Sequence, residues 1–291
     1  MKKIIKLKLK LAIQKQGRLT DETLAFLRAS GLNFESYKQK LYTTCRNFPV
    51  EIYYVRDSDI AQYVASGVVD LGIVGQNTLY EKRPKVKKVL NLRFGFCTLV
   101  IAVPKESPVS SLVDLKNKTI ATSYPASTSK YFAQRNVPIN VVTINGSVEI
   151  TPSLGVSEAV ADLTSTGSTL VLNELRILEK IYDSEAILIA NQESLTNGKE
   201  AALDQLITRF KSVLSAKDYK LVQMYLPESA LSKVKKISFG LKCPIISPTT
   251  KTGILALQYV VKEEVLWENL ERLQKFSVSN IAIMPIEKIL I

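Results

Sequence analysis

Short apolar runs alternate with amphipathic stretches along the first part of the chain. Strands are predicted where apolar runs are bounded by turn residues, at 11–13, 50–55, 68–75, 99–103, 119–122, 141–144 and 159–163. Between them, polar first turns and apolar residues at helical spacing predict helices, for example from Thr20 to Gly31 and from 56–59 to Gly67. Strands that alternate with helices predict an α/β protein with parallel sheets.

The end of the chain, from about residue 218, has a different order of elements. The pattern predicts strand, helix, strand, strand, helix and strand, at 220–226, 228–234, 242–246, 254–260, 263–276 and 280–285. In the second helix Leu266, Leu270 and Leu273 fall on one face, which predicts its buried side. The order βαββαβ is the ferredoxin-like arrangement, which does not fix a function by itself.

Composition then narrows the chemistry. The chain has 291 residues, enough for two domains, and contains no histidine. The missing histidine excludes Ser-His-Asp and Cys-His triads and every metal site with a histidine ligand. The three cysteines, Cys45, Cys97 and Cys243, are far apart and odd in number, so we expect free buried thiols rather than a disulfide framework or a zinc site.

Charge and hydropathy indicate where the protein works and what it binds. No apolar run approaches the length of a membrane span, and Lys6, Lys8 and Lys10 interrupt the start of the chain. We therefore expect a cytoplasmic protein with no signal peptide and no membrane partner. Lys and Arg number 39 against 27 Asp and Glu, and the net charge of +12 favours anionic partners such as phosphorylated small molecules.

The most informative stretch is 149–170. Its short strand at 159–163 carries Asp162 near the end, and a hydroxyl-rich turn around Gly167 leads to a helix that starts near Thr169. Backbone N–H groups at such a turn form an anion cradle, and an acidic residue just before it suits ribose hydroxyls. The pattern indicates a sugar phosphate site; a capped strand-to-helix turn is the alternative interpretation.

This stretch resembles the phosphoribosyl-pyrophosphate (PRPP) signature of ATP phosphoribosyltransferase, the first enzyme of histidine biosynthesis. The features that match in order are Glu149, Pro152, Gly155, Glu158 and the run 162–170. Segments outside the signature match in the same order, at 14–19, 55–60, 69–75, 120–125 and 145–149. The C-terminal unit resembles the regulatory domain of the family's long form.

The resemblance implies a fold and a division of the chain. It implies a catalytic unit at 1–217, with two α/β lobes similar to those of periplasmic solute-binding proteins. Lobe I is expected at about 1–94 plus 186–217 and lobe II at about 95–185. The ferredoxin-like regulatory domain is expected at 218–291, with histidine as feedback inhibitor and assembly between homodimer and homohexamer. Its loop near Ser247, Thr249 and Thr250 is the candidate histidine contact, with an ordinary turn as the alternative.

The reaction implied by the resemblance joins the adenine N1 of ATP to the anomeric carbon of PRPP and releases pyrophosphate, with Mg²⁺ as cofactor. The residues expected to bind PRPP are Glu149, Asp162, Thr164, Ser165, Thr166, Gly167, Ser168 and Thr169. Those expected to bind ATP or pyrophosphate are Lys15, Gly17, Arg18, Arg56, Asp70 and Tyr124. No metal ligands are predicted.

Each role has a plainer alternative. Asp162 and Glu149 are otherwise a helix cap or surface acids, and the basic residues are otherwise solvated surface charges. Asp70 either binds Mg²⁺-linked groups or braces its loop, and Tyr124 either stacks on adenine or packs in its loop.

The chain also departs from the family pattern in three places, which concern the adenine and triphosphate contacts. Gln76, followed by Asn77, stands where an acidic residue is common. Ala126 replaces a frequent polar residue, and Gln16 replaces a small one.

Three rival functions differ from this reading. A solute-binding module shares the two-lobed fold, but it has no use for the run 162–170. A nucleic-acid-binding regulator suits the charge, but no helix-turn-helix or RNA-recognition signature is present, so we expect no nucleic-acid partner. The common type of phosphoribosyltransferase carries two adjacent acidic residues before its loop, whereas Ala161 precedes Asp162 here.

Overall fold

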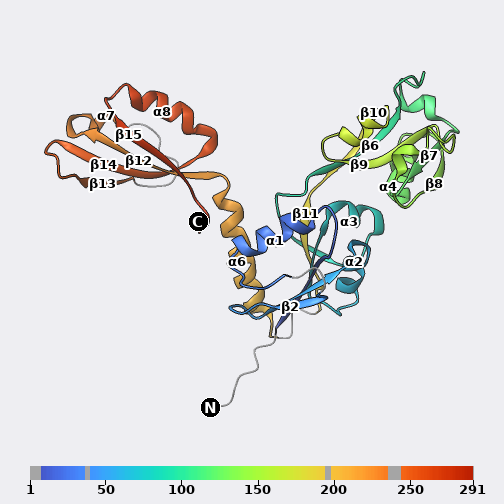
Figure 1. Cartoon of the computed structure of the whole chain (residues 1–291), viewed down its shortest axis with the longest axis horizontal. Helices are drawn as coiled ribbons and strands as arrows, with labels where there is room; N and C mark the ends of the chain where they lie inside the picture. The colour runs from blue at the N-terminus through green and yellow to red at the C-terminus, as the bar shows by residue number, and fades with distance from the viewer. Residues whose placement is uncertain (1–7, 37–39, 194–197, 235–243, 291) are drawn as a thin grey trace, which may run out of the picture. The chain divides into compact units, whose positions relative to one another are not determined.

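The computed structural model describes residues 8–36, 40–193, 198–234 and 244–290, which form two compact units. Unit 1 comprises Met1–Ala25 and Leu32–Leu203, and unit 2 comprises Phe26–Gly31 and Asp204–Ile291. Unit 1 contains two sheets, and unit 2 contains a third (Figure 1). None of the helices in the described ranges has the length and apolar character needed to cross a membrane.

The first sheet of unit 1 belongs to lobe I. Its order is β2-β3-β1-β4-β11-β5, with β1 (Leu9–Gln14), β2 (Tyr42–Thr44), β3 (Val50–Val55), β4 (Leu71–Gly75), β5 (Lys87–Asn91) and β11 (Ala186–Ala190). The helices of this part of the chain are α1 (Thr20–Ala29), α2 (Asp57–Ala65) and α3 (Gln76–Lys82). Strand β1 lies between β3 and β4, parallel to both, and is buried along most of its length. The carboxyl ends of three parallel strands therefore lie at one edge of the sheet, where ligands bind in α/β folds.

The second sheet belongs to lobe II and has the order β10-β6-β9-β7-β8. Its strands are β6 (Cys97–Pro104), β7 (Thr119–Thr122), β8 (Asn140–Thr143), β9 (Ala159–Thr164) and β10 (Leu175–Ser184). Its helices are η1 (Leu112–Leu115), α4 (Pro125–Ala133), η2 (Val148–Ile150) and α5 (Ser168–Leu172). The chain enters lobe II through β6 and returns through β10, and these two strands pair side by side (Figure 1).

The prediction of parallel sheets is correct only for three neighbouring strands of each sheet. In lobe II, β9, β7 and β8 are parallel at one end of the sheet, but β6 is antiparallel to β9 and β10 is antiparallel to β6. In lobe I, β11 is antiparallel to both β4 and β5. Glu185 is the single residue between β10, which belongs to the sheet of lobe II, and β11, which belongs to the sheet of lobe I. The returning chain therefore passes directly from one sheet into the other.

Unit 2 contains the ferredoxin-like arrangement. Its strands β12 (Tyr219–Pro227), β13 (Ile245–Pro248), β14 (Ile254–Lys262) and β15 (Ser279–Pro285) form an antiparallel sheet in the order β13-β14-β12-β15. Its helical segments are α6 (Glu200–Ala216), η4 (Glu228–Ala230), α7 (Leu231–Val234), η5 (Glu263–Val265) and α8 (Leu266–Gln274). Leu266, Leu270 and Leu273 are buried against the sheet, as their spacing predicts. The α/β class with two lobes and a ferredoxin-like C-terminal domain is thus confirmed.

Two details concern residues near the gaps in the description. The strand predicted at 242–246 starts outside the described residues and is seen from Ile245 as β13. Cys45 and Cys97 are free and buried, as expected, whereas Cys243 lies outside the described residues.

Candidate active site

The signature loop follows β9 and leads into α5. Gly167 takes a positive φ of 79°, which favours glycine, and its N–H donates to Thr164 Oγ1 at 2.8 Å. The hydroxyls of Thr166 and Ser168 lie 2.9 Å apart. Ser165, Thr166, Ser168 and Thr169 are exposed, so the loop presents hydroxyl and backbone donors to solvent at the carboxyl end of β9.

Two carboxyl groups lie beside this loop. Asp162 is largely buried in β9, and burial raises the pKa of its carboxyl to about 6, although the N–H of Leu163 donates to its Oδ1 at 2.8 Å and opposes that rise. The charge of Glu149 also raises the pKa of Asp162. Helix η2 holds Glu149, so the fold brings these two predicted residues together although they are distant along the chain.

Tyr124 lies near the same carboxyl groups. It directly precedes α4, and its N–H donates to Thr122 Oγ1 at 2.9 Å. Burial raises the pKa of the Tyr124 phenol well above its ordinary value, and the charge of Asp162 adds to the rise. The phenol is therefore within electrostatic range of Asp162 and stays protonated at neutral pH.

Basic residues of lobe I lie at the carboxyl ends of β1 and β3. Lys15 follows β1, and its N–H donates to the carbonyl of Val55 at 2.8 Å. The Arg18 guanidinium donates to the carbonyl of Gly95 at 2.7 Å, and Arg56 is exposed immediately before α2. Gly17 has a φ of 138°, so this turn also requires glycine.

Asp57 is a site residue that the sequence did not identify. It is the first residue of α2, and burial raises the pKa of its carboxyl, whereas the charges of Arg18 and Lys82 lower it. Its Oδ1 is buried, and no residue in the described part of the chain hydrogen bonds to it. The charge of Asp57 also raises the pKa of Tyr124, so this lobe I carboxyl lies within electrostatic range of a lobe II phenol. The run 56–59 holds two acids, and its pattern does not tell which one is turned inward.

Asp70 lies away from this group. It is buried just before β4 begins, whereas the basic residues follow the ends of β1 and β3. Both of its carboxylate oxygens accept from the Lys199 ammonium at 2.8 Å, and Oδ2 accepts from the N–H of Lys10 at 2.7 Å. Of the two roles considered for Asp70, this geometry supports the brace.

Two of the three departures from the family pattern, Gln76 and Ala126, lie at the start of α3 and in the first turn of α4. Gln76 starts α3, and its Oε1 accepts from the Lys88 ammonium at 2.9 Å. The N–H of Ala126 donates to Glu81 Oε1 at 2.7 Å, and the N–H of Ser127 donates to Glu81 Oε2 at 2.8 Å. Helix α3 of lobe I is therefore tied to the start of α4 in lobe II by backbone groups, which every residue type at position 126 except proline can supply.

A cavity of about 340 Å³ adjoins the signature loop. Its lining includes Ser165 of that loop, Gln76 of α3 and the residues Phe96, Cys97 and Thr98 at the start of β6. Phe96 is 61% exposed, so the cavity has one aromatic wall beside the hydroxyl-rich loop. Asp183 and Glu185 also line it, so among the described residues its walls carry two carboxyl groups and no Lys or Arg side chain.

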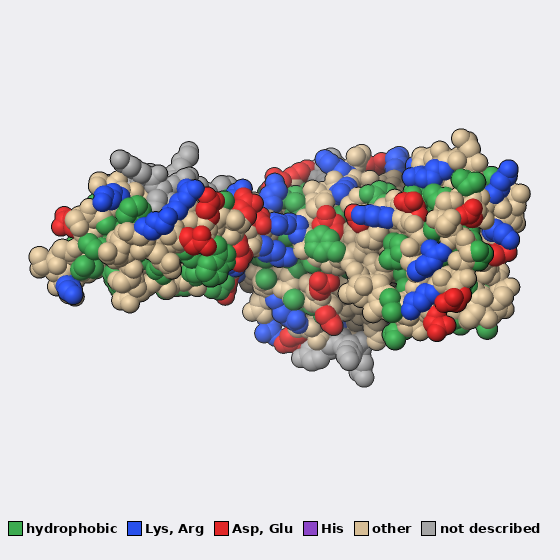
Figure 2. Space-filling model, turned by 90° about the horizontal axis from the view of Figure 1, so that it is seen from above, with side chains coloured by type: hydrophobic (Ala, Val, Ile, Leu, Met, Phe, Trp, Pro, Cys, Tyr) green, Lys and Arg blue, Asp and Glu red, His purple; other side chains and the backbone are tan. Residues whose placement is uncertain are grey.

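Two further kinds of site would be a metal cage and a continuous basic surface. In the described ranges no three His, Cys, Asp or Glu side chains are grouped so as to hold a metal ion. On the face shown in Figure 2, Lys and Arg side chains are interspersed with Asp and Glu side chains. The site itself combines hydroxyl and backbone donors with a small set of partly buried carboxyl groups.

Comparison with known proteins decides the family. The family model described as HisG, ATP phosphoribosyltransferase, matches residues 56–212, and the model of the HisG C-terminal domain matches residues 216–288. The chain belongs to the ATP phosphoribosyltransferase family. The two matched segments cover the part of lobe I from residue 56 onward, lobe II and the ferredoxin-like arrangement.

Relatives and solved structures agree with this family. The ATP phosphoribosyltransferase of Cytophaga hutchinsonii is 40% identical over 97% of this chain and 98% of that protein. The one from Parabacteroides distasonis is 38% identical over 97% of this chain and 100% of that protein. A chain in the ATP phosphoribosyl transferase (HisG:HisZ) complex from Thermotoga maritima matches with a TM-score of 0.60 and 28% identity, over 70% of this chain and 98% of its own.

The resemblance seen in the sequence is therefore confirmed at the level of family and activity class. The chain is a long-form member, because the C-terminal domain model matches in the same chain as the catalytic model. It is a transferase of the first step of histidine biosynthesis, as its relatives are named.

Proposed function

We propose that unit 1 transfers the 5-phosphoribosyl group of PRPP to N1 of the adenine of ATP, giving phosphoribosyl-ATP and pyrophosphate. The observation that carries the proposal is the pairing of Asp162 and Glu149 beside the hydroxyl-rich loop 164–169. The phosphate of a sugar phosphate needs hydrogen-bond donors, and its ribose hydroxyls need acceptors beside them. The family to which the chain belongs is named for the same reaction.

The loop is the proposed site of the 5-phosphate of PRPP. Thr164, Ser165, Thr166, Gly167, Ser168 and Thr169 supply hydroxyl and backbone donors. Asp162 and Glu149 accept hydrogen bonds from the ribose hydroxyls. Although burial raises the pKa of Asp162 to about 6, this value still lies below neutral pH, so most of the carboxyl is ionised and accepts from both hydroxyls. This arrangement fixes the anomeric carbon with respect to the cleft.

The facing residues of lobe I and Tyr124 are proposed to hold ATP and the leaving pyrophosphate. Lys15, Arg18 and Arg56 balance the phosphate charges, and the turn at Gly17 lets the backbone approach them. The Tyr124 ring stacks on adenine, since an aromatic face suits a purine. Asp70 takes no part in binding, because its two oxygens are held by Lys199 and by the N–H of Lys10.

Catalysis in this site is mainly positioning and charge stabilisation. Adenine N1 carries a lone pair, so no base is needed to activate it, and the missing histidine is no obstacle. The developing positive charge on the ribose lies next to Asp162 and Glu149, and the negative charge of pyrophosphate lies toward the basic residues.

Mg²⁺ is proposed to arrive with the diphosphate of PRPP. The described residues offer no metal cage, but Mg²⁺ commonly uses one or two carboxylates together with substrate phosphates. Asp162 and Glu149 fit that mode, since both are carboxylates at the loop that would hold PRPP. The ion would supply positive charge for the departing pyrophosphate.

The C-terminal domain is proposed to be the histidine sensor and part of the assembly of homodimers into homohexamers. The predicted division places this domain at 218–291 and catalysis at 1–217. In the loop after β13, the Thr249 hydroxyl is used within the turn, where the carbonyl of Ile254 lies 2.9 Å away. Ser247 and Thr250 are left as the candidate contacts for the amino acid. Removing the chain from residue 218 should abolish inhibition by histidine while the reaction persists, and inhibition that survived would refute this placement.

The experiment that tests the proposed reaction supplies the protein with ATP, PRPP and Mg²⁺. Pyrophosphatase draws the reaction forward, and mass spectrometry detects phosphoribosyl-ATP. We expect product formation that depends on both ATP and PRPP. We also propose that the enzyme works in the cytoplasm. Intact ATP and PRPP after incubation with folded protein would contradict the proposal and favour a ligand-binding module.

A further inference from the structure

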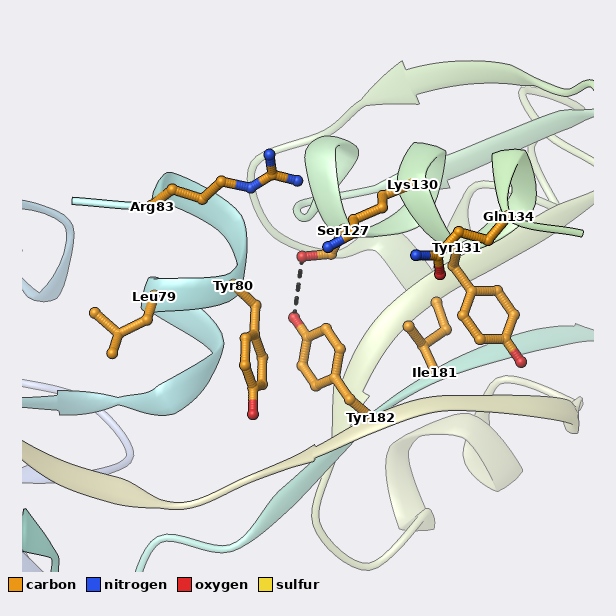
Figure 3. Close-up of a pocket in the computed structure, with 9 residues that line it drawn as sticks. All are labelled: Leu79, Tyr80, Arg83, Ser127, Lys130, Tyr131, Gln134, Ile181 and Tyr182. Atoms are coloured by element: carbon orange, nitrogen blue, oxygen red, sulfur yellow. Dashed lines mark hydrogen bonds between the residues drawn. The ribbon is translucent and has the colours of Figure 1, made fainter. Parts of the chain in front are cut away.

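One feature of unit 1 that the proposed reaction does not use is a cavity of about 360 Å³ beside the strands that join the lobes. Tyr80 and Arg83 at the end of α3 form one wall, Lys130 and Tyr131 of α4 form the other, and Tyr182 of β10 lies between them (Figure 3). None of the residues assigned to PRPP or ATP lines it. The cavity is therefore separate from the proposed substrate site.

The charged side chains that line the cavity are all positive. The side chains of Arg83 and Lys130 reach from opposite walls toward the gap between α3 and α4 (Figure 3). Among the described residues, no carboxylate forms an ion pair with either side chain, and none of the lining residues is acidic. The neighbouring carboxylate, Glu81, is held by the backbone N–H groups of Ala126 and Ser127. Two cations directed at one space favour an anionic group such as a phosphate.

The rest of the lining is aromatic. The rings of Tyr80 and Tyr182 meet edge to face, with centroids 4.6 Å apart, and the Tyr182 hydroxyl donates to Ser127 Oγ at 3.3 Å (Figure 3). This contact fixes Tyr182, and Tyr80 remains 38% exposed, so part of its ring is open to a ligand. The face of Tyr131 is covered by the Arg135 guanidinium at 3.5 Å and offers only its edge. A flat ring placed against Tyr80 would lie within reach of both cations.

We propose that this cavity is a second nucleotide site, which binds a nucleoside monophosphate through a base on Tyr80 and a phosphate on Arg83 and Lys130. Its volume suits a ligand of that size. Because α3 belongs to lobe I and α4 to lobe II, a ligand held by both helices restrains the two lobes together. Occupancy of the cavity then changes the rate of the reaction without contact with the substrates.

The test is calorimetric titration of the full-length protein with GMP, a purine monophosphate that is not a substrate. We expect the double variant Arg83→Gln/Lys130→Gln to lower GMP affinity by about tenfold or more, as loss of charge-assisted phosphate contacts predicts. The control Lys105→Gln/Lys116→Gln removes the same charge from exposed positions of lobe II and should bind as the wild type does. Ribose 5-phosphate, which has no base, should not compete for this site.

A third variant separates the cavity from the substrate loop. Ser165→Ala/Thr166→Ala removes hydroxyls of the signature loop, and it should leave GMP affinity unchanged. If GMP affinity falls in this variant and is unchanged in the cavity variant, GMP binds at the substrate loop and the proposal is overturned. Absence of GMP binding to the wild type overturns it as well. Arg83 has a φ of 45°, so Arg83→Gly/Lys130→Gln is a second cavity variant whose backbone suits the position, and circular dichroism verifies its folding.

Discussion

The carboxylate of Glu81 in lobe I accepts a hydrogen bond of 2.7 Å from the backbone N–H of Ala126 in lobe II. Its second oxygen accepts from the N–H of Ser127 at 2.8 Å, so one side chain of α3 caps the N-terminus of α4. A negative charge at the start of a helix also interacts favourably with the helix dipole. The contact joins the two lobes at a point close to Tyr124, which directly precedes α4.

Glu81→Ala should loosen this connection. We expect faster hydrogen exchange at the amides of Ala126 and Ser127, because both lose their acceptor. Two charge-assisted hydrogen bonds that a half-buried carboxylate accepts contribute on the order of 1–3 kcal/mol to local stability. Glu106→Ala, which removes an exposed carboxylate from lobe II, is the control. Equal exchange in the two variants would show that the contact does not hold the lobes.

Asp70→Asn should reduce stability and spare substrate binding. Asp70 is 2% exposed, so the substitution leaves the Lys199 ammonium without its buried partner. A broken buried pair costs on the order of 3 kcal/mol, measured here as a lower midpoint of urea unfolding. The double variant Asp70→Asn/Lys199→Met should recover part of the loss. A large rise in the KM for PRPP with unchanged unfolding would instead assign Asp70 to the site.

Asp162→Asn should make the protein more stable at high pH. The folded-state pKa of Asp162, about 6, lies above the ordinary aspartate value of 3.8, so folding favours the protonated carboxyl. In the wild type this contribution is fully present below about pH 4 and is lost as the pH rises through 6. The side chain of Asn does not titrate. The free energy of unfolding of the variant should therefore rise relative to that of the wild type across this pH range, by on the order of 1–3 kcal/mol above pH 7. Urea unfolding of both proteins at several pH values measures it, and a constant difference would contradict the assignment of this pKa.

Gly167→Ala should impair PRPP use. Gly167 and Gly253 have nearly the same φ, 79° and 78°, and an added Cβ meets no atom at either position. An alanine at either site therefore carries the same backbone cost, about 1–2 kcal/mol. Gly253→Ala is thus a matched control in unit 2. Only Gly167→Ala should raise the KM for PRPP, and an equal effect of the two substitutions would remove the loop from the substrate site.

The sequence predicts the fold best where elements are short, apolar and bounded by turns. The strands at 50–55 and 119–122 match β3 and β7 residue for residue, and the ferredoxin-like order is recovered. Strand β10 was not predicted because it lies at the edge of its sheet and exposes much of its length, so it lacks an apolar pattern. Helix α3 is short and polar, and its position depends on contacts with other parts of the chain.

The site was predictable where residues share a local motif. The signature loop with Asp162 could be found from its spacing, whereas Glu81 and Asp57 could not. Their contacts join residues that are dozens of positions apart, and neither has a pattern that separates it from a surface acid. For Asp70, the sequence left two roles open because its partner Lys199 is distant along the chain.

The placement of PRPP at the end of β9 is tested by titration calorimetry of PRPP into the wild type and into Asp162→Ala. We expect the variant to stay folded and to bind PRPP at least about tenfold more weakly, because the ribose hydroxyls of PRPP lose a charged acceptor. Equal affinity of the two proteins would contradict the placement of PRPP at the end of β9.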